Sequence, residues 1–196
     1  PNGPSGTLLP YAKVAALCQR VDGVLVVDEA YVDFAEGSCI RLIDAHPNAI
    51  IVRTMSKSFS LAGLRIGFAF AAAELIAGMW KVKDHYNLNR LSLVAAEAAL
   101  EDIDTMRQNA ARVCQTRQRL CERLRGLGFY VWDSQANFAL ARIDGDAAAL
   151  YAQLKERRIL VRYFSEPPRL ANCLRISVGT DAETDALLAA LEELVA

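Results

Sequence analysis

The residues best suited to chemistry lie in one segment, Thr54 to Phe68, whose only lysine is Lys57. Three serines surround this lysine, and Arg65 follows eight residues later. The apolar run 49–53 precedes the segment and is typical of a buried strand. The end of a buried strand is an unusual place for a lysine that only serves as a surface charge. A lysine that forms a Schiff base needs partial burial, and a phosphate needs hydroxyl and guanidinium donors nearby. The alternative is a solvated loop with an incidental lysine.

A second apolar run carries an acidic residue at its end. Residues 24–27 read Val-Leu-Val-Val and lead into Asp28, with Tyr31 three residues further on. The two runs are far enough apart for a crossover, so we expect parallel strands with Asp28 and Lys57 facing one cleft at their carboxyl ends. An aspartate there can keep a pyridinium nitrogen protonated, as pyridoxal phosphate requires. A tyrosine at position 31 can reach the phenolic oxygen of that ring.

Several segments, in this order, resemble the fold-type-I pyridoxal-phosphate aminotransferases, most closely the histidinol-phosphate aminotransferases. The combination of the DEAY and lysine segments is specific, whereas the opening PNGPSGT alone is weak. The segments that carry the resemblance are Pro1–Thr7 (PNGPSGT), Asp28–Tyr31 (DEAY), Ser56–Phe68 (SKSFSLAGLRIGF), Tyr86–Asn89, Ser134–Phe138, Ile159–Arg162 and Cys173–Thr180.

The resemblance implies an α/β fold class. Residues 1–101 would complete the sheet of the large, cofactor-binding domain, and residues 102–196 would form a small C-terminal α/β domain. In the family the opening turn lies well inside the chain, so we expect a C-terminal portion of a longer enzyme. The upstream part would supply an aromatic that stacks on the cofactor, amides for its phosphate, and residues of a homodimer interface.

The resemblance also assigns the cofactor site. Lys57, Asp28 and Tyr31 would be catalytic, and all three would contact pyridoxal 5'-phosphate. Ser56, Arg65 and Thr54 would hold its phosphate.

The opening turn departs from the family pattern. The family places an asparagine immediately before the second proline, where this chain has Gly3. Asn2, one residue earlier, either takes over the contact with the cofactor or is an ordinary turn residue.

The substrate site is expected around arginines. Strand alternation in residues 173–178 puts Leu174 and Ile176 on one face and Arg175 on the other. The family uses an arginine there to grip a substrate anion, and Arg162 would add a second grip, which suits a phosphate. Structural ion pairs are the alternative for both arginines. Tyr86 and Asn137 match family motifs, either in contact with substrate or in supporting positions.

The implied reaction is a ping-pong transamination of histidine biosynthesis. Lys57 would hold the cofactor covalently, be displaced by the substrate amine, and then move a proton from the substrate α-carbon. The amino donor would be histidinol phosphate, the acceptor 2-oxoglutarate, and the product glutamate.

Composition limits the other classes of function. The chain has 196 residues, 53% of them hydrophobic, and a net charge of −1 without a basic stripe, which argues against nucleic acid as a partner. No apolar run approaches membrane-spanning length. The five cysteines are odd in number and lack metal-ligand spacing, so we expect reduced thiols, a cytoplasmic location and no metal site.

Other functions stay open from the sequence. An aromatic-amino-acid aminotransferase or a threonine-phosphate decarboxylase of the same fold would share every cofactor residue. A regulator could use such a domain to sense a ligand, with a DNA-binding helix-turn-helix upstream. The chain could also be an inert fragment that binds no cofactor alone.

Periodicity predicts the elements that must position these residues. The final helix should open with a capping box at Thr180 and Glu183, and Gly67 should allow a close backbone approach. Helices are predicted at 10–21, 72–82, 91–100, 104–125, 146–157 and from 180 to the end. Strands are predicted at 24–27, 49–53, 64–70, 129–132, 137–143, 159–162 and 174–178. In the family the strand that corresponds to 64–70 is antiparallel to its neighbours.

Overall fold

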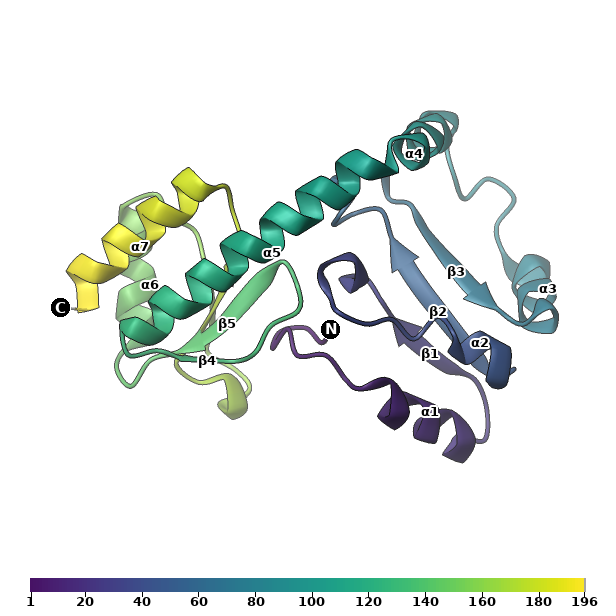
Figure 1. Cartoon of the computed structure of the whole chain (residues 1–196), viewed down its shortest axis with the longest axis horizontal. Coiled ribbons are helices and arrows are strands. Elements are labelled where there is room, and N and C mark those ends of the chain that lie inside the picture. The colour runs from purple at the N-terminus through teal and green to yellow at the C-terminus, as the bar shows by residue number, and fades with distance from the viewer. Residues whose placement is uncertain (196) are drawn as a thin grey trace. The chain divides into compact units, whose positions relative to one another are not determined.

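The computed structural model describes residues 1–195 and divides into two compact units. The first unit comprises Pro1 and Leu8–Ala110, and the second comprises Asn2–Thr7 and the chain from Ala111 onward. Each unit contains its own sheet with helices, which confirms the predicted α/β class (Figure 1). The division falls inside the long helix α5 (Ile103–Gly126), whereas the sequence placed it between residues 101 and 102. The assignment of the two parts as cofactor domain and small domain stays a prediction.

The sheet of the first unit has three strands in the order β1 (Leu25–Asp28), β2 (Ala49–Thr54) and β3 (Gly67–Ala71). As expected, β1 and β2 are parallel and β3 is antiparallel to β2. Asp28 pairs with Val52 in this register. The carboxyl ends of β1 and β2 therefore lie at the same edge of the sheet, where ligands bind in open α/β sheets.

Helices cover one face of this sheet, because α1 and α2 pack their apolar side chains against β2. Val14 and Cys18 of α1 and Leu42 of α2 join Ala49 and Ile51 in a buried cluster. The helices of the unit are α1 (Tyr11–Arg20), α2 (Leu42–Ala45), α3 (Ala73–Val82) and α4 (Arg90–Glu101). Gly67 allows a close approach as predicted, since a Cβ there would lie 2.8 Å from the Arg53 carbonyl oxygen.

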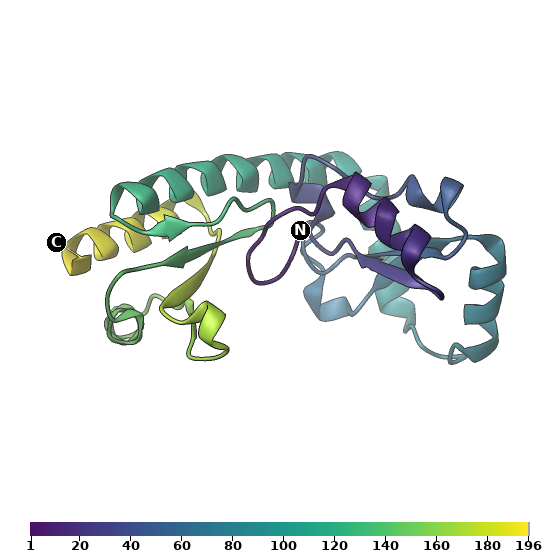
Figure 2. The ribbon, with the colours of Figure 1, turned by 90° about the horizontal axis from the view of Figure 1, so that it is seen from below.

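The second unit has a four-stranded antiparallel sheet in the order β4-β5-β7-β6. Its helix α5 runs beside α7 (Figure 2), and ion pairs such as Arg119–Asp181 join the two helices. A core of leucines from the helices packs on one face of the sheet, against side chains such as Leu174 and Ile176. Its other elements are β4 (Tyr130–Val131), β5 (Phe138–Arg142), α6 (Ala147–Glu156), β6 (Arg162–Phe164), β7 (Cys173–Ser177) and α7 (Asp181–Val195).

Two predicted strands begin three residues later than the hydrophobic pattern suggested, at Gly67 instead of 64 and at Arg162 instead of 159. Residues 62–64 form a 3-10 turn and Arg65 adopts a left-handed conformation, so β3 starts only at Gly67. The strand predicted at 159–162 starts at Arg162 instead. Here the Ile159 N–H donates to the Leu154 carbonyl at 2.9 Å and closes the end of α6, so the apolar run serves a helix terminus. The capping box of α7 is confirmed, because Thr180 and Glu183 exchange hydrogen bonds at 2.7 and 3.2 Å.

Candidate active site

Lys57 lies in a turn that directly follows β2 and is anchored in the interior of the first unit. Met55, at the start of this turn, is 1% exposed, and the Leu61 N–H donates to the Met55 carbonyl at 3.0 Å. The Lys57 side chain is half-buried, and its Nζ lies 5.4 Å from the centroid of the Tyr31 ring. The structure therefore brings the predicted amine within cation–π range of the predicted phenol. Their catalytic roles stay predictions.

Three predicted anion donors gather beside the same turn. Thr54 Oγ1 lies 2.9 Å from Ser56 Oγ, and Arg65 Nη1 lies 3.5 Å from that same serine oxygen. The Arg65 guanidinium also donates to the Ala62 carbonyl at 2.9 Å. Two hydroxyls and a guanidinium in one cluster match the donors that a phosphate group accepts from.

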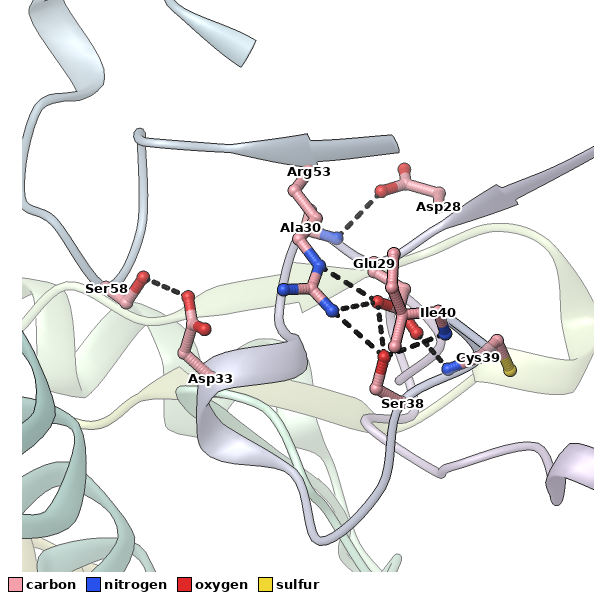
Figure 3. Close-up of polar contacts among 9 residues, drawn as sticks. All are labelled: Asp28, Glu29, Ala30, Asp33, Ser38, Cys39, Ile40, Arg53 and Ser58. Carbon is pink, nitrogen blue, oxygen red and sulfur yellow. Dashed lines mark hydrogen bonds and ion pairs between the residues drawn. The ribbon is translucent and has the colours of Figure 1, made fainter. Parts of the chain in front are cut away.

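Asp28 ends β1 and lies at the carboxyl edge of the sheet. Side chains alternate along the strand and beyond its end, so Asp28 is exposed while the next residue, Glu29, is buried. The two carboxylates point in different directions (Figure 3). Asp28 Oδ1 accepts the N–H of Ala30 at 2.9 Å, which helps to fix the carboxylate at the start of the loop that carries Tyr31.

A buried ion pair lies on the other side of this loop and was not predicted from the sequence. Glu29 is 6% exposed and accepts two hydrogen bonds from Arg53, at 3.0 and 2.9 Å. Ser38 Oγ also donates to this carboxylate at 3.0 Å, as does the Cys39 N–H (Figure 3). Burial, and to a lesser extent the nearby Glu29 charge, raises the pKa of the Cys39 thiol. Glu29 thus joins the end of β1, the loop at 38–39 and strand β2.

A second unpredicted contact joins the same loop to the lysine turn. Ser58, the residue after Lys57, is 5% exposed and donates through Oγ to Asp33 Oδ2 (Figure 3). Asp33 lies in the 3-10 turn Val32–Phe34 that follows Tyr31.

One signal in the sequence pointed to part of this arrangement. Strand alternation turns Glu29 away from Asp28, toward the face on which Arg53 lies. The β1–β2 register pairs Asp28 with Val52 and so places Glu29 opposite Arg53. This register cannot be predicted from the sequence of either strand alone.

The opening turn belongs to the second unit. Asn2 is exposed, its Nδ2 donates to Ser5 Oγ at 3.2 Å, and its carbonyl accepts the Gly6 N–H at 2.7 Å. The Gly6 carbonyl in turn accepts the Gln135 N–H at 2.8 Å. These contacts describe an ordered turn, and a cofactor contact by Asn2 stays a prediction.

The two predicted substrate arginines also lie in the second unit and are direct cross-strand neighbours. Arg162 of β6 pairs with Arg175 of β7, so both side chains leave the same face of the sheet. Each guanidinium covers an aromatic ring, Arg175 over Phe138 and Arg162 over Phe164, both at 5.1 Å from the centroid. The alternation predicted for β7 is present, because its leucine and isoleucine are buried while Arg175 is partly exposed.

The remaining predicted residues occupy less informative positions. Tyr86 of the first unit is 93% exposed in the segment between α3 and α4. Asn137 of the second unit accepts the Val178 N–H through its carbonyl at 2.9 Å, and its side chain is partly buried. The substrate contacts of both residues stay predictions.

The chain is similar to known proteins in sequence. The sequence matches the model of the aminotransferase class I and II family over residues 1–191. It is 47% identical over 196 residues to histidinol-phosphate aminotransferase 1 of Nostoc sp., covering 100% of this chain and 55% of that protein. It is 49% identical over 196 residues to histidinol-phosphate aminotransferase of Microcystis aeruginosa, covering 100% and 56%.

A solved structure is similar as well. It is the crystal structure of histidinol-phosphate aminotransferase from Sinorhizobium meliloti in complex with pyridoxal-5'-phosphate, with a TM-score of 0.89 and 32% identity. The match covers 100% of this chain and 55% of that one. The chain therefore has the fold of this enzyme over the matched region, and spans about half the length of these relatives.

Proposed function

Because that family's model matches residues 1–191, the chain belongs to the aminotransferase class I and II family, and on this premise we propose that the protein is a pyridoxal-phosphate-dependent aminotransferase. The proposed reaction transfers the amino group of histidinol phosphate to 2-oxoglutarate and yields glutamate. One observation of the structure carries the proposal: an amine at Lys57, a phenol at Tyr31 and a cluster of anion donors lie around one turn. The names of relatives at 47% and 49% identity support the choice of substrate.

The residues of the lysine turn fit pyridoxal phosphate. Thr54, Ser56 and Arg65 supply hydroxyl and guanidinium donors for its phosphate, and Lys57 supplies the amine that attaches it. When bound, the cofactor supplies an aldehyde that condenses with amines and a pyridinium ring that withdraws electrons from the substrate α-carbon.

The side chains of the chain itself then do the proton chemistry. The Lys57 amine, once released, acts as the base that removes the proton from the substrate α-carbon and returns one during product formation. The Asp28 carboxylate keeps the proton on the ring nitrogen of the cofactor. The Tyr31 hydroxyl orients the phenolic oxygen of the cofactor ring. The contact between Lys57 Nζ and the aromatic ring of Tyr31 keeps the amine close to Tyr31.

The paired arginines support a substrate that carries a phosphate. Two cationic side chains directly opposite each other in a sheet repel, and a dianion between them would remove the repulsion. A guanidinium also matches a phosphate with two parallel hydrogen bonds. This pair therefore favours histidinol phosphate over an aromatic amino acid, while threonine phosphate meets the same requirement.

We propose a homodimer as the active form, on the family resemblance.

Within residues 1–195 no helix is long and apolar enough to cross a membrane. The proposed cytoplasmic location rests on the odd number of cysteines in the sequence, and none of them forms a disulfide within residues 1–195.

Replacement of Lys57 tests the proposal. In the full-length protein, Lys57→Ala should abolish transamination of histidinol phosphate and the visible absorbance that pyridoxal phosphate gains on attachment. Lys13→Ala, at an exposed position of α1, is the matched control. Borohydride treatment should fix the cofactor to the peptide that contains Lys57 and to no other. Full activity or full absorbance in the Lys57→Ala variant would refute the assignment.

Turnover on three substrates separates the enzyme classes. Histidinol phosphate, phenylalanine and threonine phosphate are offered to the same preparation, and both amino transfer and loss of carbon dioxide are measured. We expect amino transfer from histidinol phosphate to dominate. Carbon dioxide released from threonine phosphate would instead identify a decarboxylase, and no absorbance change with cofactor would identify an inert protein.

A further inference from the structure

The loop that carries Asp28 and Tyr31 is joined to the lysine segment at two points, one on each side of Lys57. The first tie is the ion pair of Glu29 with Arg53, four residues before Lys57. The second is the hydrogen bond of Asp33 with Ser58, one residue after Lys57. Figure 3 shows both ties, which leave the loop from opposite ends and reach strand β2 and the turn beyond it.

Both ties use charged groups in protected surroundings. Glu29 and Ser58 are 6% and 5% exposed, so water has little access to these two groups and competes weakly for their hydrogen bonds. Hydrogen bonds to a carboxylate are shorter and stronger than those between neutral groups. The Glu29 carboxylate also accepts bonds from Ser38 and the Cys39 N–H, so its own position is fixed from several sides.

The ties act on residues that flank the chemical groups. Glu29 directly follows Asp28, and Asp33 lies two residues after Tyr31, while Ser58 directly follows Lys57. A shift of either tie therefore moves a neighbouring side chain that the proposed function assigns to the cofactor. A displacement of about 1 Å at a catalytic group can reduce rates by about a hundredfold.

We propose that Ser58 and Glu29, with their partners Asp33 and Arg53, are positioning residues that hold Tyr31 and Asp28 at fixed places relative to Lys57. The inference rests on the proposed function and deepens it. The Glu29 tie adjoins a buried cluster of the unit, because Cys39, whose N–H donates to Glu29, belongs to the same cluster as Leu42. The Ser58–Asp33 tie differs, because its acceptor Asp33 is half-buried. The Ser58–Asp33 tie can thus be removed with a small effect on folding, because the half-buried Asp33 carboxylate can take up water.

Ser58→Ala in the full-length protein tests the role. We expect the dissociation constant for pyridoxal phosphate to rise about tenfold, slightly less than the loss of one hydrogen bond to a charged group would cause, because this bond is not made to the cofactor itself. The absorbance maximum of the bound cofactor should move, since Tyr31 no longer holds its place. Ser58→Thr, which keeps the hydroxyl, should restore both readouts, and Ser165→Ala, in an exposed segment of the second unit, should leave both unchanged.

The thermal midpoint of each variant identifies an effect on folding. If Ser58→Ala unfolds, Asp33→Asn takes its place, because it keeps the size of the side chain and weakens only the charged acceptor. Suppose that the wild-type protein shows the absorbance band of bound cofactor, and that a folded Ser58→Ala or Asp33→Asn variant has the same dissociation constant and spectrum. That result would overturn the positioning role alone. A wild-type protein without any band would overturn the proposed function, and this inference with it.

Discussion

In the first unit Lys57 and Tyr31 lie on turns beyond the ends of strands and Asp28 is the last residue of β1, whereas in the second unit the candidate arginines lie within strands. The spacing of Lys57 and Tyr31 depends on a hydrogen bond between two turns and on an ion pair between the loop after β1 and strand β2. Arg162 and Arg175 owe their spacing to the β6–β7 register alone.

This difference predicts which side-chain substitutions each unit tolerates. A spacing set by register survives the loss of any one side chain, because the backbone ladder and the leucine core of the second unit remain. A spacing set by side-chain ties is more sensitive, because the Asp33–Ser58 bond joins two turns outside the ladder, whereas Glu29 is also held to β2 by the bond of its N–H to the Val52 carbonyl at 2.8 Å. The two regions should therefore respond differently to similar substitutions.

The largest expected effect on stability is at Glu29. Glu29→Ala leaves the Arg53 guanidinium, whose side chain is 23% exposed, without its carboxylate. Breaking a buried ion pair in this way costs about 3 to 5 kcal/mol, and because Arg53 is partly exposed we expect a loss of about 3 kcal/mol. Urea unfolding measures it, with the exposed Glu97→Ala of α4 as control. A loss below about 1 kcal/mol would show that the tie is not structural.

Arg175→Ala should separate binding from stability in the second unit. The free energy of unfolding should change by less than about 0.5 kcal/mol, because the lost ring contact is offset by relief of the repulsion from Arg162. If the proposed function holds, KM for histidinol phosphate should rise about tenfold to a hundredfold, as expected for charged hydrogen bonds to a phosphate.

Histidinol, which lacks the phosphate, provides the control for this substitution. Its poorer turnover should be almost the same in wild type and variant. An equal loss for both substrates would show that Arg175 does not bind the phosphate.

The smallest expected effect is a pH dependence at the start of α7. Hydrogen bonds from the Thr180 N–H and hydroxyl lower the pKa of Glu183. A carboxyl with a lowered pKa stabilises the folded state above its ordinary pKa of about 4.3, and this contribution disappears as the pH falls through the lowered value. Glu183→Gln should therefore reduce the loss of stability in acid.

Urea midpoints near neutral pH and in the acid range measure this change. Glu156→Gln of α6, which is exposed, is the control. A variant that loses as much stability in acid as the wild type would contradict the assigned role of the cap.

Motif and pattern predicted much of the fold and part of the site. The strand before Asp28, the strand before Lys57 and the capping box at Thr180 each depend on neighbours in sequence, and the structure contains all three. Arg65 Nη1 lies 3.5 Å from Ser56 Oγ, and the phosphate contacts that the resemblance implied for both residues stay predictions.

The remaining features depend on contacts that no single segment encodes. The Glu29–Arg53 pair requires the register between two strands, and the Ser58–Asp33 bond requires the geometry of two turns. The start of β6 was misplaced because the apolar residues 159–161 satisfy the end of a helix as well as they would satisfy a strand.

Arg65 has a backbone conformation, φ 54° and ψ 44°, that costs a branched or long side chain about 1 to 2 kcal/mol and costs glycine almost nothing. Glycine at this position would thus relax the backbone while removing the guanidinium. Selection for a more thermostable protein and selection for retention of a phosphorylated ligand would consequently pull this one residue in opposite directions.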